Sequence, residues 1–202
     1  MTHNTFIVYM PGAGGNHLKN LLCLSPDFAN HTELDVSVYD DTSRPPGEVW
    51  CVGGRNLQDI FFKRIFDNPG ERSVLIAHFG ELAQNRDKFL LVPDRRCVVV
   101  TMNNPAYRSV LDQRQLRLGQ AIHPYWLDEE LLWCYRSDMM LRYFGVQAQD
   151  CLEIDLADFW HTDMIHNGTL DRICDFVGTA VPKSAALELH HKWIKANFSG
   201  SI

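Results

Sequence analysis

Four short apolar runs, rich in β-branched residues, recur along the chain. They occupy residues 5–10, 73–77, 96–101 and 151–155. Runs of this length without polar alternation are typical of strands that are buried on both faces, as in a parallel sheet. The pattern therefore predicts four strands, the first of which ends at Pro11 and Gly12.

Between these runs the apolar residues change to helical spacing. After the first strand, Leu18, Leu21 and Leu22 fall on one helical face. Asn16 is a suitable N-cap for this helix, and Ser25-Pro26 is a suitable stop. Further helices are expected at 56–66, 105–117, 128–143, 170–177 and 184–197. Strands that alternate with helices predict an α/β fold with three α/β/α layers and a mostly parallel central sheet.

The size of the chain is compatible with one folded unit. It has 202 residues, of which 46% are hydrophobic and 22% are charged, and these values are typical of globular proteins. We expect a single domain over residues 1–202. Residues 25–55 are polar and rich in turn formers, so they are expected to form a loop or surface excursion whose role the sequence leaves open.

Charge and cysteine usage narrow the possible partners. A formal net charge of −6 argues against a broad nucleic-acid surface or binding to an acidic membrane. The six cysteines are far apart and form no CxxC motif, which favours buried thiols in a reducing compartment. The chain has no secretion signal and no run of eighteen apolar residues, so we expect a cytoplasmic protein without a membrane partner. The oligomeric state is left open.

The segment that carries most chemistry is the glycine-rich turn after the first strand. It comprises Pro11, Gly12, Ala13, Gly14, Gly15, Asn16 and His17. Small residues let a ligand approach the backbone, and the amides of the following helix favour an anion such as phosphate. The segment matches neither GxxxxGK[ST] nor GxGxxG, which disfavours an ordinary nucleoside triphosphatase or dinucleotide enzyme. The alternative is a tight strand-to-helix turn that holds no ligand.

Taken in order, several segments resemble the sulfotransferase family, which uses 3′-phosphoadenosine 5′-phosphosulfate (PAPS) as sulfuryl donor. The turn Pro11 to Gly15 is similar to the family's phosphosulfate loop, and Ile76-Ala77-His78 is similar to its Lys-Thr-His strand end. The other similar segments are Asn103-Asn104-Pro105 with Arg108 and Ser109, Glu153 to Leu156, and Ile173 to Gly178. The resemblance spans residues 5–197 and implies a P-loop-like sulfotransferase topology.

The resemblance also implies roles for individual residues. The turn, residues 11–17, would hold the 5′-phosphosulfate, whereas Asn103, Arg108 and Ser109 would face the 3′-phosphate. The chain departs from the family at Gly12, where a lysine is expected, and at Asn103, where an arginine is expected. The cations available to compensate are Lys19, Arg95, Arg96, Arg108 and Lys183.

His78 is the expected catalytic base, since it follows a strand at the carboxyl edge of the sheet and an imidazole titrates near working pH. The alternative is a structural histidine that caps the next helix, and Glu81 is a weaker base candidate.

No histidine pair has good spacing for zinc, so no metal is expected. Aromatic residues around the 128–143 helix form either core or an acceptor pocket, and arginines nearby, Arg136 among them, make that region locally basic or form a solvated face.

Three functions are compatible with these features. The first is a sulfotransferase that moves a sulfuryl group from PAPS to a hydroxyl or amine acceptor. The second keeps the fold as a nucleotide- or phosphate-binding module, or as an interaction module, without catalysis. The third is a divergent phosphoryl-transfer enzyme, which is disfavoured because the lysine and hydroxyl that hold phosphate and Mg²⁺ are missing.

Overall fold

Four parallel strands form the centre of the computed structural model, which describes residues 3–10, 13–31, 59–103, 107–109, 136–160 and 163–198. The strands are β1 (Asn4–Tyr9), β2 (Val74–Ala77), β3 (Arg95–Thr101) and β4 (Cys151–Asp155). Their order in the sheet is β2-β1-β3-β4, and every neighbouring pair is parallel. All four strands predicted from the apolar runs are confirmed.

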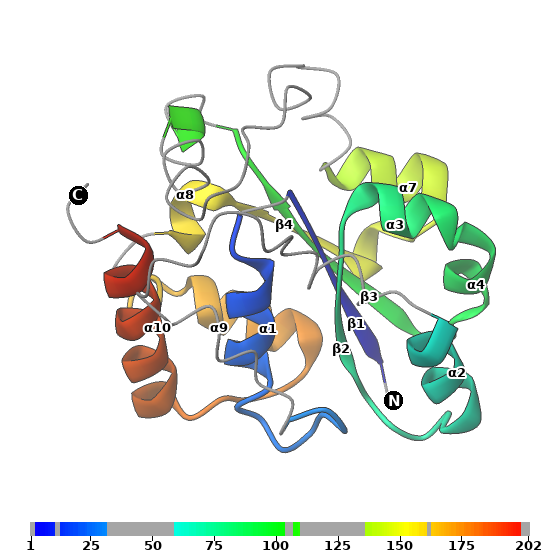
Figure 1. The fold of residues 1–202 in the computed structure, drawn as a ribbon, viewed down its shortest axis with the longest axis horizontal. Helices are drawn as coiled ribbons and strands as arrows, with labels where there is room; N and C mark the ends of the chain where they lie inside the picture. The colour runs from blue at the N-terminus through cyan, green and yellow to red at the C-terminus, as the bar shows by residue number, and fades with distance from the viewer. Residues whose placement is uncertain are drawn as a thin grey trace, which may run out of the picture.

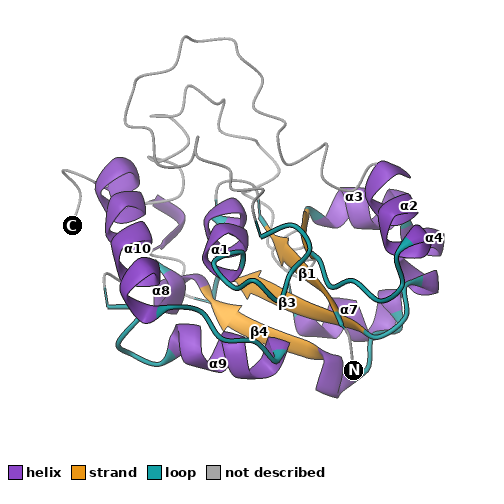
Figure 2. Cartoon of the chain, turned by 90° about the horizontal axis from the view of Figure 1, so that it is seen from below, coloured by secondary structure: helices purple, strands orange, loops and turns teal. Residues whose placement is uncertain are grey.

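Helices cover both faces of this sheet (Figures 1 and 2). They are α1 (Gly15–Leu22), α2 (Asp59–Asp67), α3 (Phe79–Gln84), α4 (Arg86–Leu91), α7 (Ser137–Phe144), α8 (Leu156–Phe159), α9 (Thr169–Val177) and α10 (Lys183–Phe198), with a 3₁₀ turn, η4, at Ala148–Asp150. Helices α1, α8, α9 and α10 lie on one side, and α2, α3, α4 and α7 on the other (Figure 1). The predicted α/β fold with helices on both faces is confirmed, while the P-loop-like topology stays a prediction.

Alternation along the strands explains the two layers of core. On β1, Ile7 and Tyr9 pack in one hydrophobic cluster with α1, α9 and α10, whereas Phe6 and Val8 pack in a second cluster with α2, α3, α4 and α7. Successive side chains of a strand point to opposite faces, so a strand with no polar alternation needs cover on both.

Apart from the start of α1, the predicted helices agree with the structure where it describes them. Helix α9 ends at Gly178 in a left-handed conformation, as the Val177-Gly178 pattern predicts, and α10 matches the predicted terminal helix. Most of the predicted 105–117 helix, 128–135 of the 128–143 helix and 56–58 of the 56–66 helix lie outside the described residues, as do 32–55 of the polar segment. Its described start contains Asn30, whose side chain bonds both the N–H and the carbonyl of Val74 and so extends the edge of β2.

Candidate functional site

The carboxyl ends of the parallel strands bring the sequence-predicted site residues to one edge of the sheet. The glycine turn follows β1, His78 follows β2 and Asn103 follows β3. The chain leaves β1 to form β2 on one side and later forms β3 on the other side. In open α/β sheets, ligands bind outside the strand ends where the order reverses in this way, here between β1 and β3.

The glycine turn starts helix α1 in an unexpected way. The amide of Ala13 donates to the carbonyl of Met10 at 2.9 Å, and Gly14 is the N-cap with a φ of 88°. The prediction that Asn16 is the N-cap is wrong, because the N-cap lies two residues earlier, at Gly14, and Asn16 Oδ1 accepts a bond from the Tyr9 hydroxyl at 3.0 Å. Pro11 and Gly12 lie outside the described residues.

Packing alone requires small residues in this turn. A Cβ on Gly14 would lie 2.8 Å from Trp193 Cζ2, and one on Gly15 would overlap the Tyr9 ring. The backbone amides of Gly14 and Gly15 have no acceptor among the described residues, as is usual in the first turn of a helix. A ligand at this turn would therefore meet amides, while the space beside both α-carbons is already filled.

The predicted ligand residue His17 has its side chain in the core. Its ring is fully buried, stacks on Trp193 with centroids 4.4 Å apart, and shares a 3.0 Å hydrogen bond between its Nε2 and Nδ1 of His190. These contacts join α1 to α10. The imidazole of His17 thus serves helix packing, and sequence pattern gave no signal of its partner 173 residues away.

His78 lies beside the end of β1, which leads into the glycine turn. Its Nδ1 donates to the carbonyl of Tyr9 at 2.9 Å, and the two rings lie 4.6 Å apart between centroids. Since a carbonyl can only accept, Nδ1 carries the proton, and in the neutral ring Nε2 keeps its lone pair. Burial lowers the pKa of His78, and the bond to Tyr9 only partly opposes this shift. The neutral form therefore predominates at neutral pH.

The backbone of His78 has the structural role that was the alternative expectation. It is the N-cap of α3, and its N–H donates to Glu81 Oε2 at 3.0 Å. Burial raises the pKa of Glu81, while this bond opposes the shift. Because the carboxylate of Glu81 is occupied by the capping box that it forms with His78, the imidazole of His78 is the better base.

Asn103, just beyond the end of β3, forms two hydrogen bonds, one through its backbone and one through its side chain. Its N–H donates to Asp155 Oδ2 at 3.1 Å, and its Oδ1 accepts from Arg136 Nη2 at 3.2 Å. Among the described residues this is the one hydrogen bond of the Arg136 guanidinium, which has no carboxylate partner there. Arg136 therefore brings a positive charge to the position where the family resemblance implies an arginine.

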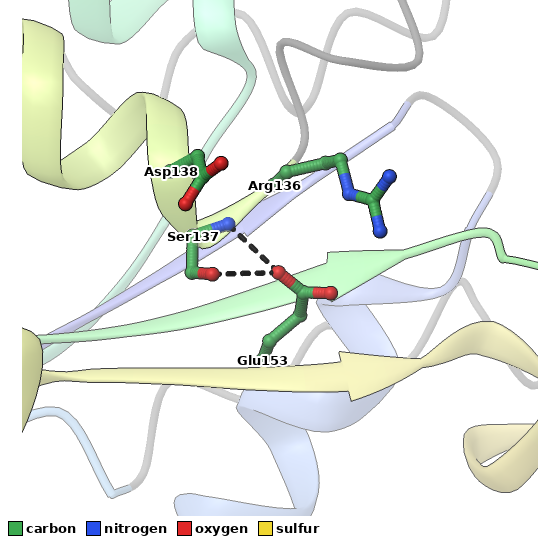
Figure 3. A pocket seen from close by; sticks show the side chains of 4 residues that line it. All are labelled: Arg136, Ser137, Asp138 and Glu153. Atoms are coloured by element: carbon green, nitrogen blue, oxygen red, sulfur yellow. Dashed lines mark hydrogen bonds between the residues drawn. The ribbon is translucent and has the colours of Figure 1, made fainter.

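Arg136 also lines a polar cavity of about 340 Å³ beside β4, together with Ser137, Asp138 and Glu153 (Figure 3). Glu153 Oε2 accepts from both the N–H and the hydroxyl of Ser137, each at 2.8 Å, and so caps α7. Figure 3 shows the Arg136 side chain extending away from this cap. The guanidinium is thus held at the sheet edge by the start of α7 and by Asn103.

Three of the other cations expected to compensate lie elsewhere. Arg95 and Arg96 are at the amino end of β3, where they bond the carbonyls of Leu90, Val92 and Phe176. Lys183 Nζ bonds Asp171 at 2.8 Å. Arg108 and Ser109 belong to a short described helical segment, residues 107–109, in which Arg108 is partly buried and Ser109 is exposed.

Comparison with protein-family models gives no match for this chain, and comparison with curated proteins gives none either.

Among the described residues, histidine, cysteine, aspartate and glutamate side chains form no group of three or more that could hold a metal ion. No helix in the described part of the chain is both long enough and apolar enough to cross a bilayer.

Proposed function

We propose that this protein is a sulfotransferase-like enzyme that moves a sulfuryl group from PAPS to a hydroxyl or amine acceptor. The observation that carries the proposal is the 2.9 Å bond from His78 Nδ1 to the Tyr9 carbonyl. It holds a neutral imidazole beside the glycine turn, at the edge of the sheet where a ligand is expected. A base and an anion-binding turn are the two parts that sulfuryl transfer needs.

Donor binding would use the backbone more than side chains. The amides of Gly14 and Gly15 and the amino end of α1 would face the 5′-phosphosulfate. Arg136, oriented by Asn103, would supply the cation for the 3′-phosphate. A charge-assisted hydrogen bond of this kind contributes about 1.5–3 kcal/mol, so this one residue can offset part of what the family positions at Gly12 and Asn103 lack.

In the transfer step the acceptor oxygen or nitrogen attacks sulfur while His78 Nε2 takes its proton. The bond between sulfur and the bridging oxygen of the donor breaks, and that oxygen leaves as the 5′-phosphate of adenosine 3′,5′-bisphosphate. Positive helix ends and amides stabilise charge that develops on the leaving group. The Tyr9 carbonyl keeps Nδ1 protonated and stabilises the imidazolium formed in this step.

One observation favours a second function, a binding module without catalysis. Trp193 and Tyr9 occupy the space beside Gly14 and Gly15, so packing accounts for both glycines without a ligand. Such a module would keep the fold and lack donor chemistry. The two functions differ in a measurable way, because only the enzyme consumes PAPS.

The test is a transfer assay with labelled PAPS and a panel of hydroxyl and amine acceptors, run on wild type and His78→Ala. The proposed enzyme transfers label in the wild type and loses most transfer per folded molecule in the variant. Binding of adenosine 3′,5′-bisphosphate without transfer across the panel supports the binding module. Absence of both transfer and binding contradicts both functions.

A further inference from the structure

The short helix α8 touches both loops that flank the candidate site. It follows β4 directly, and Asp155 is its N-cap. Asp155 Oδ1 accepts from Ala157 N at 2.7 Å, and Oδ2 accepts from Asn103 N at 3.1 Å. One carboxylate therefore starts α8 and at the same time holds the chain that leaves β3.

The other end of α8 holds the glycine turn. Trp160, which follows the helix, donates from Nε1 to the carbonyl of Ala13 at 3.0 Å, and both residues are almost fully buried. The ring of Phe159, the last residue of α8, would lie 3.0 Å from a Cβ on Gly14. The Ala13 carbonyl points into the protein because this indole N–H binds it.

Trp160 also reaches the segment beyond β3. Its ring lies 6.3 Å from the ring of Tyr107 between centroids, in an edge-to-face arrangement. Tyr107 begins the described helical segment that contains Arg108 and Ser109. Through Asp155 at one end and Trp160 at the other, α8 contacts the turn after β1 and the chain after β3.

We propose that α8 is a positioning element that sets the distance between the two loops, with Asp155 and Trp160 as its positioning residues. This rests on the proposed function, in which the turn and the Asn103 region hold the two phosphate-bearing ends of one donor. A ligand that bridges two loops binds well only if both are held at the right separation before it arrives. Asp155 and Trp160 are positioning residues because they act through Asn103 and Ala13.

The first test needs no ligand and compares Trp160→Phe with Leu170→Val by hydrogen exchange. The phenyl ring fills most of the same space but leaves the buried Ala13 carbonyl without its donor. Leu170 is a buried residue of the same hydrophobic cluster in α9 and controls for general loss of packing. We expect about tenfold faster exchange at Ala13 and Leu18, whose amides bond across the turn, in Trp160→Phe only.

The second test compares the affinities for adenosine 3′,5′-bisphosphate and for AMP, well below the unfolding temperature. Trp160→Phe should weaken both ligands about tenfold, since each needs the turn. Asp155→Ala should weaken both ligands, and the bisphosphate more than AMP, because it releases Asn103 directly and reaches the turn only through the lost cap of α8. Asp155→Asn, which keeps one acceptor oxygen, replaces it if the alanine variant fails to fold. Leu170→Val should change neither affinity.

The two proposals fail in different ways. Wild type that binds neither nucleotide contradicts the proposed function, and the exchange comparison then decides whether α8 positions the turn. Wild type that binds, with Trp160→Phe equal to Leu170→Val in exchange and in both affinities, overturns the role of α8. An unchanged ratio of bisphosphate to AMP affinity in Asp155→Ala and Asp155→Asn overturns the role of Asp155.

Discussion

His78 donates its Nδ1 proton to the Tyr9 carbonyl across 2.9 Å, and this bond selects the tautomer in which Nε2 can act as a base. The bond joins the residue after β2 to the last residue of β1. It also sets the ring beside the turn, so the position and the protonation of the imidazole have one structural cause.

His78→Ala should lower kcat by a factor on the order of 10²–10⁴ and leave bisphosphate affinity nearly unchanged, because general-base assistance acts in the transition state. His191→Ala is the matched control, since His191 is exposed on α10. The measurement is sulfuryl transfer per folded molecule at saturating PAPS. Equal activity in the two variants would remove His78 from the mechanism.

The pH dependence follows from the direction of the His78 shift. Burial lowers its pKa, so the base form predominates above the ordinary value of about 6.5. The rate should rise as pH rises toward that value and be level above it. The unfolded chain takes up this proton more readily than the folded one, so His78 lowers stability as pH falls below about 6.5, and His78→Gln should reduce that loss. A midpoint for kcat above 7 in the wild type would contradict this assignment.

The glycines of the turn should differ sharply from a glycine with free space. Gly14→Ala and Gly15→Ala each place a methyl group against Trp193 or Tyr9, and Gly14 has a positive φ, so each should destabilise the protein by roughly 1–3 kcal/mol. Gly80 lies in α3 with nothing within 4 Å of a Cβ, so Gly80→Ala should be neutral or slightly stabilising. Denaturant unfolding measures all three. Equal stability of the three variants would mean that the turn is looser than its contacts imply.

The described cysteines should be poor nucleophiles in the folded protein. Burial raises the pKa of Cys151 to about 12 and that of Cys174 to about 11, and it raises the pKa of Cys97 as well. Since the thiolate is the reacting form, alkylation of Cys151 by iodoacetamide at pH 8 should be about 10³-fold slower in native protein than in urea. Mass mapping of the modified peptides measures this difference. Rapid labelling of Cys151 in the native protein would mean that this residue of β4 is less buried than the structure shows.

The positive charge of Arg136 should strengthen binding of the nucleotide. Arg136→Gln keeps a hydrogen-bond donor near Asn103 but removes the charge, so it should weaken adenosine 3′,5′-bisphosphate about tenfold and AMP little. Arg142→Gln in α7, the helix that Arg136 precedes, is the matched control, because that side chain is exposed in the last turn of the helix. If both variants lose bisphosphate affinity equally, the effect is one of general charge and Arg136 has no specific role.

The strands were predictable because each is a local signal. Val98, Val99 and Val100 are fully buried. A continuous run of branched apolar residues is typical of a strand that is covered on both faces, as in a parallel sheet. Gly178 likewise marks the end of α9 locally, since its left-handed conformation suits glycine. Alternation of strands and helices then placed the turn and His78 at one edge.

The missed features depend on contacts between distant segments. Asn16 is a good N-cap residue by type, but Tyr9 takes its side chain and Gly14 caps the helix instead. The bond from Trp160 to Ala13 spans 147 residues, and nothing in the local pattern around Trp160 indicates it. Arg136 was one of several arginines in the sequence, and its contact with Asn103 sets it apart from them.

The most direct test of the proposed donor site is calorimetric titration of wild-type protein with adenosine 3′,5′-bisphosphate, with AMP as the matched ligand. The proposed site should give saturable one-to-one binding of the bisphosphate that is at least about tenfold tighter than binding of AMP, because the second phosphate meets Arg136 beside Asn103. No saturable binding of the bisphosphate, or equal affinity for the two nucleotides, would contradict it.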